Sequence, residues 1–593
     1  MRASRPVLAN ESITATRGMV VAQHPLGARA GLEVLAKGGN AVDAAVTTAF
    51  AMGVVQPLMN GIGGGGQMIV RLGGGTEGAV DYGMKAPLTA SDDMYELLPE
   101  PEALGAGTLR FSTRYNWPQV RGNAHLDGHS AIATPGTVAG LSAALARWGT
   151  MDLKDAIAPA LELAENGFAI GHHMSLALVN GRDKFLGFPG TTPIFYPNGQ
   201  PIATGERLVQ ADYARTLRLI ADGGPDAFYR GEPAQRIAED AQASGARLSK
   251  EDFAAYEAVV YEQVLRTNYH NAEVLAVPGP GAAPTLIEIL NILSNFDLRL
   301  LGYGNLDSLH VIAEAIKMAA VDRFSYLGDC APDGGPVDVL MDPEYAAKRA
   351  AEIGRLAAEA EPGDPWAHAG TAKPAGYPAP AGLGPDGGTT HLTVVDATGG
   401  AVSLTQTLHG YSGVVTPGVG AMMNNGMGWF YPGPGTVNSV SPGGRGLHNM
   451  VPVLLVQDGA LRAALGASGG RRIWTAVVQA IVHYVDFDMA LQDAVQTPRI
   501  HVETDRILLD GRFGTEIRDA LIRMGHDVMA ATPRYDSAPF SEPNGISFDG
   551  SEYESAVYPV AKPTIALGLD DGDTGEIGTD DTDLLESTGG LMP

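Results

Sequence analysis

The chain has 593 residues, of which 45% are hydrophobic and 18% charged, so it belongs to the folded, globular class. Its formal net charge of −27 repels the phosphates of nucleic acids, which excludes nucleic acid as a partner. The one cysteine, Cys330, excludes an intrachain disulfide and a thiolate metal cluster. We expect neither a metal ion nor a cofactor.

The first residues, MRASRPVLANESITATRG, contain no apolar run of the kind that a secretory signal needs. No stretch of the chain reaches the roughly 18 uncharged apolar residues that cross a membrane. We therefore expect no membrane contact and a cytoplasmic location.

The first third of the chain alternates short apolar runs with helical patterns. Residues 19–24 predict a buried strand, and 25–55 predict two helices, the second capped by Asn40. The glycine-rich segment 61–66 lacks the GK[ST] ending of a phosphate loop and leads into a strand-like run, QMIVRL. Its glycines therefore indicate close backbone packing rather than a nucleotide site.

Helical patterns continue over 135–166, 207–266 and 305–325, with Asp152 placed to cap a helix. Residues 361–388 are rich in Pro, Gly and Ala, a composition typical of a flexible linker that forms neither helix nor strand.

The character of the sequence changes at Thr389. Residues 389–407 hold two β-branched runs around a Thr-Gly-Gly turn, which predicts a hairpin. Further strands are expected at 451–456, 461–466, 498–508 and 556–568, with a buried helix at 471–485 and a disordered acidic tail at 574–593.

A threonine at the end of a flexible linker has a specific chemical use. Once the preceding peptide bond is cut, the new α-amine can act as the base for the threonine hydroxyl. An unperturbed α-amine titrates near pH ~8, so part of it is a free base at neutral pH. Asp386-Gly387-Gly388 would make that bond accessible, although Gly-Gly-Thr-Thr is also common in ordinary turns.

An ordered set of motifs supports the hypothesis that Thr389 is a nucleophile. It comprises RGMVVAQHPLGARAGLEVLAKGGNAVDAAV, GIGGGG at 61–66, TPGTVAGL at 134–141, AVDRFSYLGD at 320–329, GGTTHLTVVD at 387–396, MMNNGMGWF at 422–430 and GASGGRR at 466–472. By these residues the chain resembles the γ-glutamyltranspeptidase family of N-terminal-nucleophile hydrolases, from about residue 17 to residue 570.

The resemblance implies an α+β fold, the four-layer αββα sandwich of these hydrolases. It implies a precursor cut between Gly388 and Thr389 into a large subunit, 1–388, and a small subunit, 389–593, which stay together as a heterodimer or a dimer of heterodimers. It makes Thr389 the nucleophile and Thr407 its hydrogen-bonding partner, with the amides of Gly469 and Gly470 as the oxyanion hole. Thr405 lies on the same strand face as Thr407, because side chains alternate along a strand.

The substrate pocket departs from the family pattern. The arginine that holds the substrate α-carboxylate in that family is Gly83 here, and Lys85 is the nearby positive charge that could replace it. The segment between Phe430 and Arg445 is also short, which predicts an open pocket. The residues at the expected substrate-binding positions are Tyr82, Lys85, Thr405, His409, Trp429, His448 and Asn449.

Three functions remain open at this point. The first is an amidohydrolase that forms an acyl-threonine on a non-peptide amide, similar to cephalosporin acylases or oxamate amidohydrolases, with a small-molecule amide and water as substrates. The second is a γ-glutamyltransferase or glutathione hydrolase that binds its substrate through substituted residues. The third is an uncleaved relative that serves as a binding protein.

Overall fold

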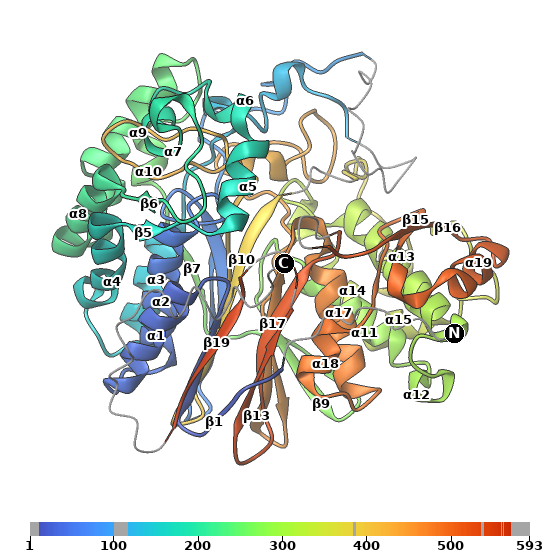
Figure 1. Cartoon of the computed structure of the whole chain (residues 1–593). Coiled ribbons are helices and arrows are strands. Elements are labelled where there is room, and N and C mark those ends of the chain that lie inside the picture. The colour runs from blue at the N-terminus through green and yellow to red at the C-terminus, as the bar shows by residue number, and fades with distance from the viewer. Residues whose placement is uncertain are drawn as a thin grey trace.

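Two stacked β-sheets lie between two layers of helices in the computed structural model, which describes residues 11–99, 117–382, 387–534, 539–558, 560 and 563–570 (Figure 1). Each main sheet has seven strands, and the helices cover the outer face of each sheet. This arrangement confirms the predicted four-layer αββα sandwich.

The first sheet carries the predicted hairpin at its centre. Its strands, in spatial order, are β19 (Ile565–Leu569), β2 (Gly18–Ala22), β10 (Gly388–Asp396), β11 (Ala401–His409), β3 (Gly65–Arg71), β4 (Glu77–Tyr82) and β7 (Val259–Tyr261). The strands of the second sheet are β1 (Thr14–Ala15), β18 (Tyr553–Val557), β17 (Glu542–Phe548), β13 (Ala460–Ser468), β12 (Val453–Gln457), β9 (Ala272–Ala276) and β8 (Leu265–Tyr269). Two small sheets pair β5 (Phe168–Ala169) with β6 (Arg207–Leu208), and β14 (Ile500–His501) with β15 (Arg506–Asp510) and β16 (Asp527–Ala531).

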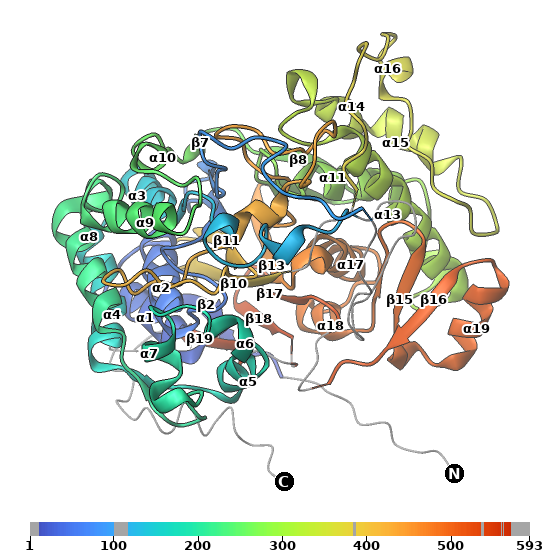
Figure 2. The ribbon, with the colours of Figure 1, turned by 90° about the horizontal axis from the view of Figure 1, so that it is seen from above.

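The helices fall into two groups. On the side of the first sheet lie α1 (Pro25–Ala36), α2 (Ala41–Val55), α3 (Thr137–Trp148), α4 (Leu153–Asn166), α5 (His172–Asn180), α6 (Arg182–Phe185), α7 (Thr192–Phe195), α8 (Ala211–Tyr229), α9 (Glu232–Ala243) and α10 (Lys250–Ala254). On the side of the second sheet lie α11 (Ala283–Leu293), α12 (Leu298–Leu301), α13 (Leu306–Tyr326), α14 (Val337–Leu340), α15 (Pro343–Ala350), α16 (Pro365–His368), α17 (Ile473–Val485), α18 (Leu491–Gln496) and α19 (Thr515–Arg523). Figure 2 shows β15, β16 and α19 at the edge of the molecule, far from α1 to α4.

Side-chain alternation divides each strand between two cores. In β2, Val20 and Ala22 pack with the helices, whereas Met19 and Val21 pack between the sheets. The next residue on the inter-sheet side is Gln23, which is fully buried. The layer between the sheets is therefore apolar at one end and becomes polar where β2 ends.

The glycine-rich segment serves close packing, as predicted. A Cβ at Gly64 would lie 2.3 Å from the Thr407 carbonyl oxygen, and one at Gly66 would lie 2.6 Å from that of Thr405. Only glycine lets β3 lie this close to β11.

Segments on both sides of Thr389 are interleaved in the two sheets. In the first sheet β10 and β11 lie between β2 and β3, and in the second sheet β12 and β13 lie between β9 and β17. Each sheet therefore needs strands from both parts of the chain.

Some predicted boundaries are wrong. Residues 259–269 hold β7 and β8 rather than helix, because Val259-Val260-Tyr261 and the alternating run Leu265–Tyr269 suit a pleated edge. The range 498–508 is divided between β14 and β15. The predicted tail at 574–593 lies outside the described residues.

The proposed linker has more structure than its composition predicts. The stretch 361–382 contains α16, and its Ala381 N–H donates to the Phe324 carbonyl at 2.8 Å. Lys373 lies over the rings of Tyr326, Trp366 and Tyr377. The expectation that no helix forms here is therefore wrong at 365–368, since Asp364 caps that turn. The flexibility of the segment stays a prediction.

No helix in the described ranges is both long enough and apolar enough to cross a bilayer.

The capping prediction at Asn40 is confirmed and leads to a test. The Asn40 side chain accepts from the N–H groups of Val42 and Asp43, and its amide donates to the Trp148 carbonyl. Asn40→Ala should lower the free energy of unfolding by about 1–2 kcal/mol, measured by urea denaturation. The cap expected of Asp152 is wrong, since Asp152 precedes α4 at the same position without a side-chain capping bond. Asp152→Ala is therefore the matched control, and its loss of unfolding free energy should stay within about 0.5 kcal/mol. Equal losses in the two variants would contradict the assignment.

Candidate active site

Thr389 lies at a β-bulge in the hairpin. Gly388 pairs with His409 and Thr390 pairs with Gln406, and the register shifts between these two pairs. A bulge re-aims the side chain of the extra residue. The Thr389 side chain is 3% exposed, so its hydroxyl is held within the protein rather than on a mobile linker.

The Thr407 hydroxyl connects the groups around this bulge. It accepts from the Thr389 hydroxyl at 3.3 Å and from the His409 N–H at 2.7 Å. It donates its own proton to the Gly388 carbonyl oxygen at 2.5 Å. Thr407 thus contacts both the hydroxyl at residue 389 and the carbonyl of the bond before it.

The residues before Thr389 pass through a narrow space. A Cβ at Gly387 would lie 2.5 Å from Cδ2 of His409, and one at Gly388 would lie 2.9 Å from the Met59 sulfur. The His409 carbonyl oxygen, 2.7 Å from a Cβ at Gly387, leaves room only for glycine at 387, whereas at Gly388 the flexible Met59 side chain can move aside.

This geometry suits intramolecular acyl transfer. A hydrogen bond from Thr407 draws electron density toward the Gly388 oxygen, where negative charge would develop if the Thr389 hydroxyl attacked that carbonyl. Cutting the bond would remove the carbonyl acceptor and create an amine on the residue that bears the hydroxyl.

The predicted oxyanion turn follows β13. Gly469 and Gly470 have φ values of 125° and 61°, and α17 begins three residues after Gly470, at Ile473. Among the described residues, neither amide has an acceptor for its N–H. Unsatisfied N–H groups at a helix start favour a negative oxygen.

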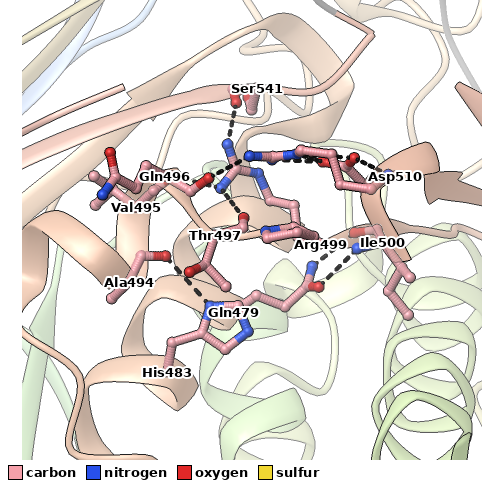
Figure 3. Close-up of polar contacts among 12 residues, drawn as sticks. Gln479, His483, Ala494, Val495, Gln496, Thr497, Arg499, Ile500, Asp510 and Ser541 are labelled. Atoms are coloured by element: carbon pink, nitrogen blue, oxygen red, sulfur yellow. Dashed lines mark hydrogen bonds and ion pairs between the residues drawn. The ribbon is translucent and has the colours of Figure 1, made fainter. Parts of the chain in front are cut away.

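Ser541 supports this turn from behind. Its hydroxyl donates to the Ser468 carbonyl at 2.7 Å, and a Cβ at Gly469 would lie 2.8 Å from the Ser541 Cα. The buried Arg499 in turn donates to the Ser541 carbonyl at 3.0 Å (Figure 3). The backbone of the oxyanion turn therefore rests on a hydrogen-bonded support.

A side chain that sequence reasoning missed joins the two parts of the site. Gln23 accepts from the Thr390 hydroxyl at 3.0 Å and donates to the Ser468 hydroxyl at 2.6 Å. Thr390 follows Thr389, and Ser468 precedes Gly469. Gln23 therefore links the residue after the predicted nucleophile to the residue before the predicted oxyanion turn.

A pocket opens beside the oxyanion turn. Its walls include Arg323, Trp429, Asn438, Asn449, Arg471 and Glu503. The structure thus brings the predicted residues Trp429 and Asn449 to a common cavity. Arg471, which follows Gly470 directly, is neutralised by a bidentate pair with Glu503. Burial raises the pKa of Glu503, but Arg471 and His501 outweigh it and hold that pKa at about 2.

An aromatic row runs from the nucleophile to this pocket. The His409 ring lies 6.0 Å from the Trp429 ring, which lies 5.0 Å from the His448 ring. Neither ring nitrogen of His448 has a hydrogen-bond partner among the described residues, although this side chain is buried. Burial lowers the pKa of His448 to about 3, and Arg323 and Arg445 add to the effect. His448 is therefore neutral at physiological pH.

Three predicted substrate-binding residues lie elsewhere. Tyr82 is fully buried, because glycines at 66 and 140 form a slot for its ring. The Thr405 hydroxyl contacts Nδ1 of His391 at 2.8 Å, deeper along the strand than Thr407. Lys85 lies over the Tyr256 ring, 5.1 Å from its centroid. We correct the assignment of Tyr82 and Thr405 to structural roles, and a substrate contact by Lys85 stays a prediction.

One group in the described chain has ligand atoms for a metal ion: His310, Glu314 and His526, which lie between α13 and the segment after α19. Its atoms already bond to protein groups. Nδ1 of His310 is 2.8 Å from Nε2 of His526, and Glu314 forms an ion pair with the buried Lys317. A dication would compete with both contacts, so we assign no metal here.

Comparisons with known proteins agree with this geometry. The family model described as gamma-glutamyltranspeptidase matches residues 27–565. The chain is 37% identical to the acylase ACY 1 proenzyme of Pseudomonas sp. (strain V22), covering 87% of this chain and 88% of that protein. It is 34% identical to the glutathione hydrolase proenzyme of Escherichia coli (strain K12), covering 87% and 86%. Among solved structures, cephalosporin acylase from Bacillus halodurans is similar, with a TM-score of 0.81, 25% identity and coverage of 96% and 98%.

The oxyanion turn can be tested with one methyl group. Gly469→Ala should reduce turnover by about 10²-fold or more, because the Cβ would collide with Ser541 and displace the amides. Gly459→Ala is the control, since Gly459 has a φ of 77° and open space around it. Steady-state kinetics on both variants should show a loss only at position 469; a similar loss at both positions would contradict the role of the turn.

Proposed function

The chain belongs to the gamma-glutamyltranspeptidase family, and on that premise we propose that it cuts itself before Thr389 and then hydrolyses linear amides through an acyl-threonine. As an N-terminal-nucleophile amidohydrolase it acts on C–N bonds other than peptide bonds. In the proposed cycle the Thr389 hydroxyl attacks the amide carbonyl, and the Thr389 amine takes up the hydroxyl proton and returns it to the leaving amine. Water then releases the acyl group.

The surroundings of Thr389 support this assignment. A threonine at a bulge contacts the Thr407 hydroxyl, which is also bonded to the carbonyl of the bond to be cut. The Gly469 and Gly470 amides lie at the end of a strand that Gln23 links to Thr390. Nucleophile and oxyanion donors are the two parts that acyl transfer needs.

Cutting at this bond would produce subunits of 388 and 205 residues. Both would contribute strands to each sheet, since β10 and β11 lie between β2 and β3. Separation would expose the sheet cores to water, so we propose that the two products remain together as an αβ heterodimer.

The substrate proposal rests on the neutral aromatic row beside Thr407. A buried zwitterion needs charged partners, and a γ-glutamyl group would meet Trp429 and the uncharged His448 where it needs them. An uncharged acyl group with a flat or hydrogen-bonding end would instead stack on Trp429 and bond to His448. Two of the similar proteins are named as acylases, which also supports an uncharged acyl group. We therefore propose an amide of an uncharged acyl group as the substrate class.

A second candidate is a glutathione hydrolase. The guanidinium groups of Arg323 and Arg471 on the pocket wall favour this alternative, as does the name of the Escherichia coli relative. However, Glu503 pairs with Arg471, and Arg323 is held by the carbonyls of Gly281 and His448. We therefore rank this function second.

A pair of substrates with one leaving group separates the two functions. Phenylacetyl-p-nitroanilide should be hydrolysed with a kcat/KM at least about tenfold above that of γ-glutamyl-p-nitroanilide, because the pocket lacks partners for the zwitterion. Release of p-nitroaniline gives both values. The reverse order would favour the glutathione hydrolase.

Substitution at residue 389 tests the nucleophile. Thr389→Ala should leave a single full-length band on a denaturing gel and show no turnover, because no hydroxyl remains. Thr389→Ser should retain part of both activities. Mass spectrometry of the wild-type small subunit should find a fragment that begins Thr-Thr-His-Leu. An alanine variant that is still cut and active would falsify the assignment, and a wild-type chain that stays whole would favour a binding protein.

A further inference from the structure

The two parts of the site belong to different sheets. Thr389 lies on β10 of the first sheet, and the oxyanion turn follows β13 of the second. The core between the sheets is largely apolar, with residues such as Val21, Val395 and Leu454, and the Ser403 hydroxyl donates to the Leu465 carbonyl across it. Apolar contacts are not directional, so small sliding movements between the two sheets cost little free energy. Catalysis needs the reacting groups to be placed more accurately than apolar contacts between the sheets can hold them.

Gln23 is the polar side chain that bridges this interface next to the site. It follows β2 directly, on the inter-sheet side, and is fully buried. Its Oε1 accepts from the Thr390 hydroxyl at 3.0 Å and from the His391 N–H at 3.2 Å. Its Nε2 donates to the Ser468 hydroxyl at 2.6 Å and to the Glu542 carboxylate at 3.2 Å.

The chemistry of these four contacts fixes the orientation of the amide. Two donors face Oε1, and two groups that accept face Nε2, so the flipped amide would place its N–H groups against the N–H of His391. Glutamine supplies both an acceptor and a two-proton donor on one rigid plane. A carboxylate in its place would face Glu542, and an apolar side chain would make none of the four bonds.

The contacts fall on the residues next to the reacting groups. Thr390 and His391 follow Thr389, and Ser468 precedes Gly469. Ser468 also pairs with Glu542 across β13 and β17, so the carboxylate that accepts from Gln23 belongs to the same sheet as the turn. Gln56 shares the one proton of the Thr390 hydroxyl, because its Oε1 also accepts from that hydroxyl at 2.8 Å, and its Nε2 donates to the Gln23 carbonyl.

We propose that Gln23 is a positioning residue that holds the Thr389 strand in register with the Gly469-Gly470 amides, both during self-cleavage and during turnover. This proposal rests on the proposed function, because it takes Thr389 as the nucleophile. Gln23 does not touch the pocket wall formed by Trp429 and Asn449. Its loss therefore affects the rate of the chemical step and leaves substrate binding nearly unchanged.

The test compares two buried glutamines. Gln23→Met keeps the size of the side chain and removes its hydrogen bonds. Gln479→Met is the matched control, because Gln479 is equally buried and bonds to Thr475 and Ile500, both within the small-subunit sequence. Figure 3 shows its contacts with Ile500. Both variants should show a similar fall in thermal midpoint.

We expect Gln23→Met to slow self-cleavage, followed on a denaturing gel, by about 10²-fold. The processed enzyme that accumulates should show a kcat reduced by a similar factor and a KM within about threefold of wild type. Gln479→Met should process and turn over at rates within about twofold of wild type. Equal rates for Gln23→Met and wild type, or equal losses in both variants, would overturn the proposal.

A third variant gives a readout that simple destabilisation does not produce. In Gln23→Glu the new carboxyl can donate one hydrogen bond when protonated, and it repels Glu542 when ionised. Self-cleavage of this variant should therefore be faster at pH 5 than at pH 8 relative to wild type at the same pH. A ratio that does not change with pH would overturn the proposal.

Self-cleavage is followed on a denaturing gel without any added substrate, so this test of Gln23 does not depend on the proposed substrate class. A wild-type chain that is never cut before Thr389 overturns the proposed function together with the role of Gln23. A wild-type chain that is cut, beside a Gln23→Met chain cut at the same rate, overturns the role of Gln23 alone.

Discussion

The pairing of β10 with β11, and its bulge at Thr389, is the constraint on which the site depends. The hairpin places Thr389 and Thr407 on neighbouring strands, close enough for their hydroxyls to meet. The bulge lets the Thr407 hydroxyl reach the Gly388 carbonyl as well. Because glycines let β3 lie directly against β11, the hairpin has a rigid neighbour that holds it in place. One local irregularity in a regular ladder thus brings a hydroxyl, a carbonyl and a proton donor together.

The remaining parts of the site come from other layers. The second sheet provides the turn at Gly469 and Gly470 that we propose as the oxyanion hole, supported by Ser541 and Arg499. Loops provide the pocket, which Trp429 lines. In the proposed function, Trp429 and the neutral His448 ring 5.0 Å from it stand where an amino-acid substrate would need charged groups. The same scaffold can therefore keep its acyl-transfer chemistry while its pocket accepts a different acyl group. Relatives named as acylases and as glutathione hydrolases, both more than 30% identical to this chain, are consistent with that division.

Local patterns in the sequence predicted those features that neighbouring residues determine. The hairpin after Thr389, the cap at Asn40 and the tight backbone at the glycine-rich segment all depend on a few consecutive residues, and all are confirmed. The wrong predictions concern how deeply a side chain is buried and which residues distant in the sequence it contacts. Alternation correctly placed Thr405 on the same face as Thr407, but Thr405 bonds to His391, whereas Thr407, nearer the end of the strand, contacts Thr389. Gln23 has no local signal at all, since its four partners lie on three strands, β10, β13 and β17, that are distant from it in the sequence.

The contact between Ala381 and Phe324 has a consequence for the cleaved enzyme. A cut before Thr389 would free a new carboxylate at Gly388, yet the chain would stay anchored at residue 381. Residues 382–388, at about 3.4 Å each, reach at most about 24 Å, so this end could not diffuse away. Confined to that radius, it would face the nucleophile at a local concentration in the millimolar range, roughly as a tethered ligand does. The first product that such an enzyme must release from its active site would be the C-terminal end of its own large subunit.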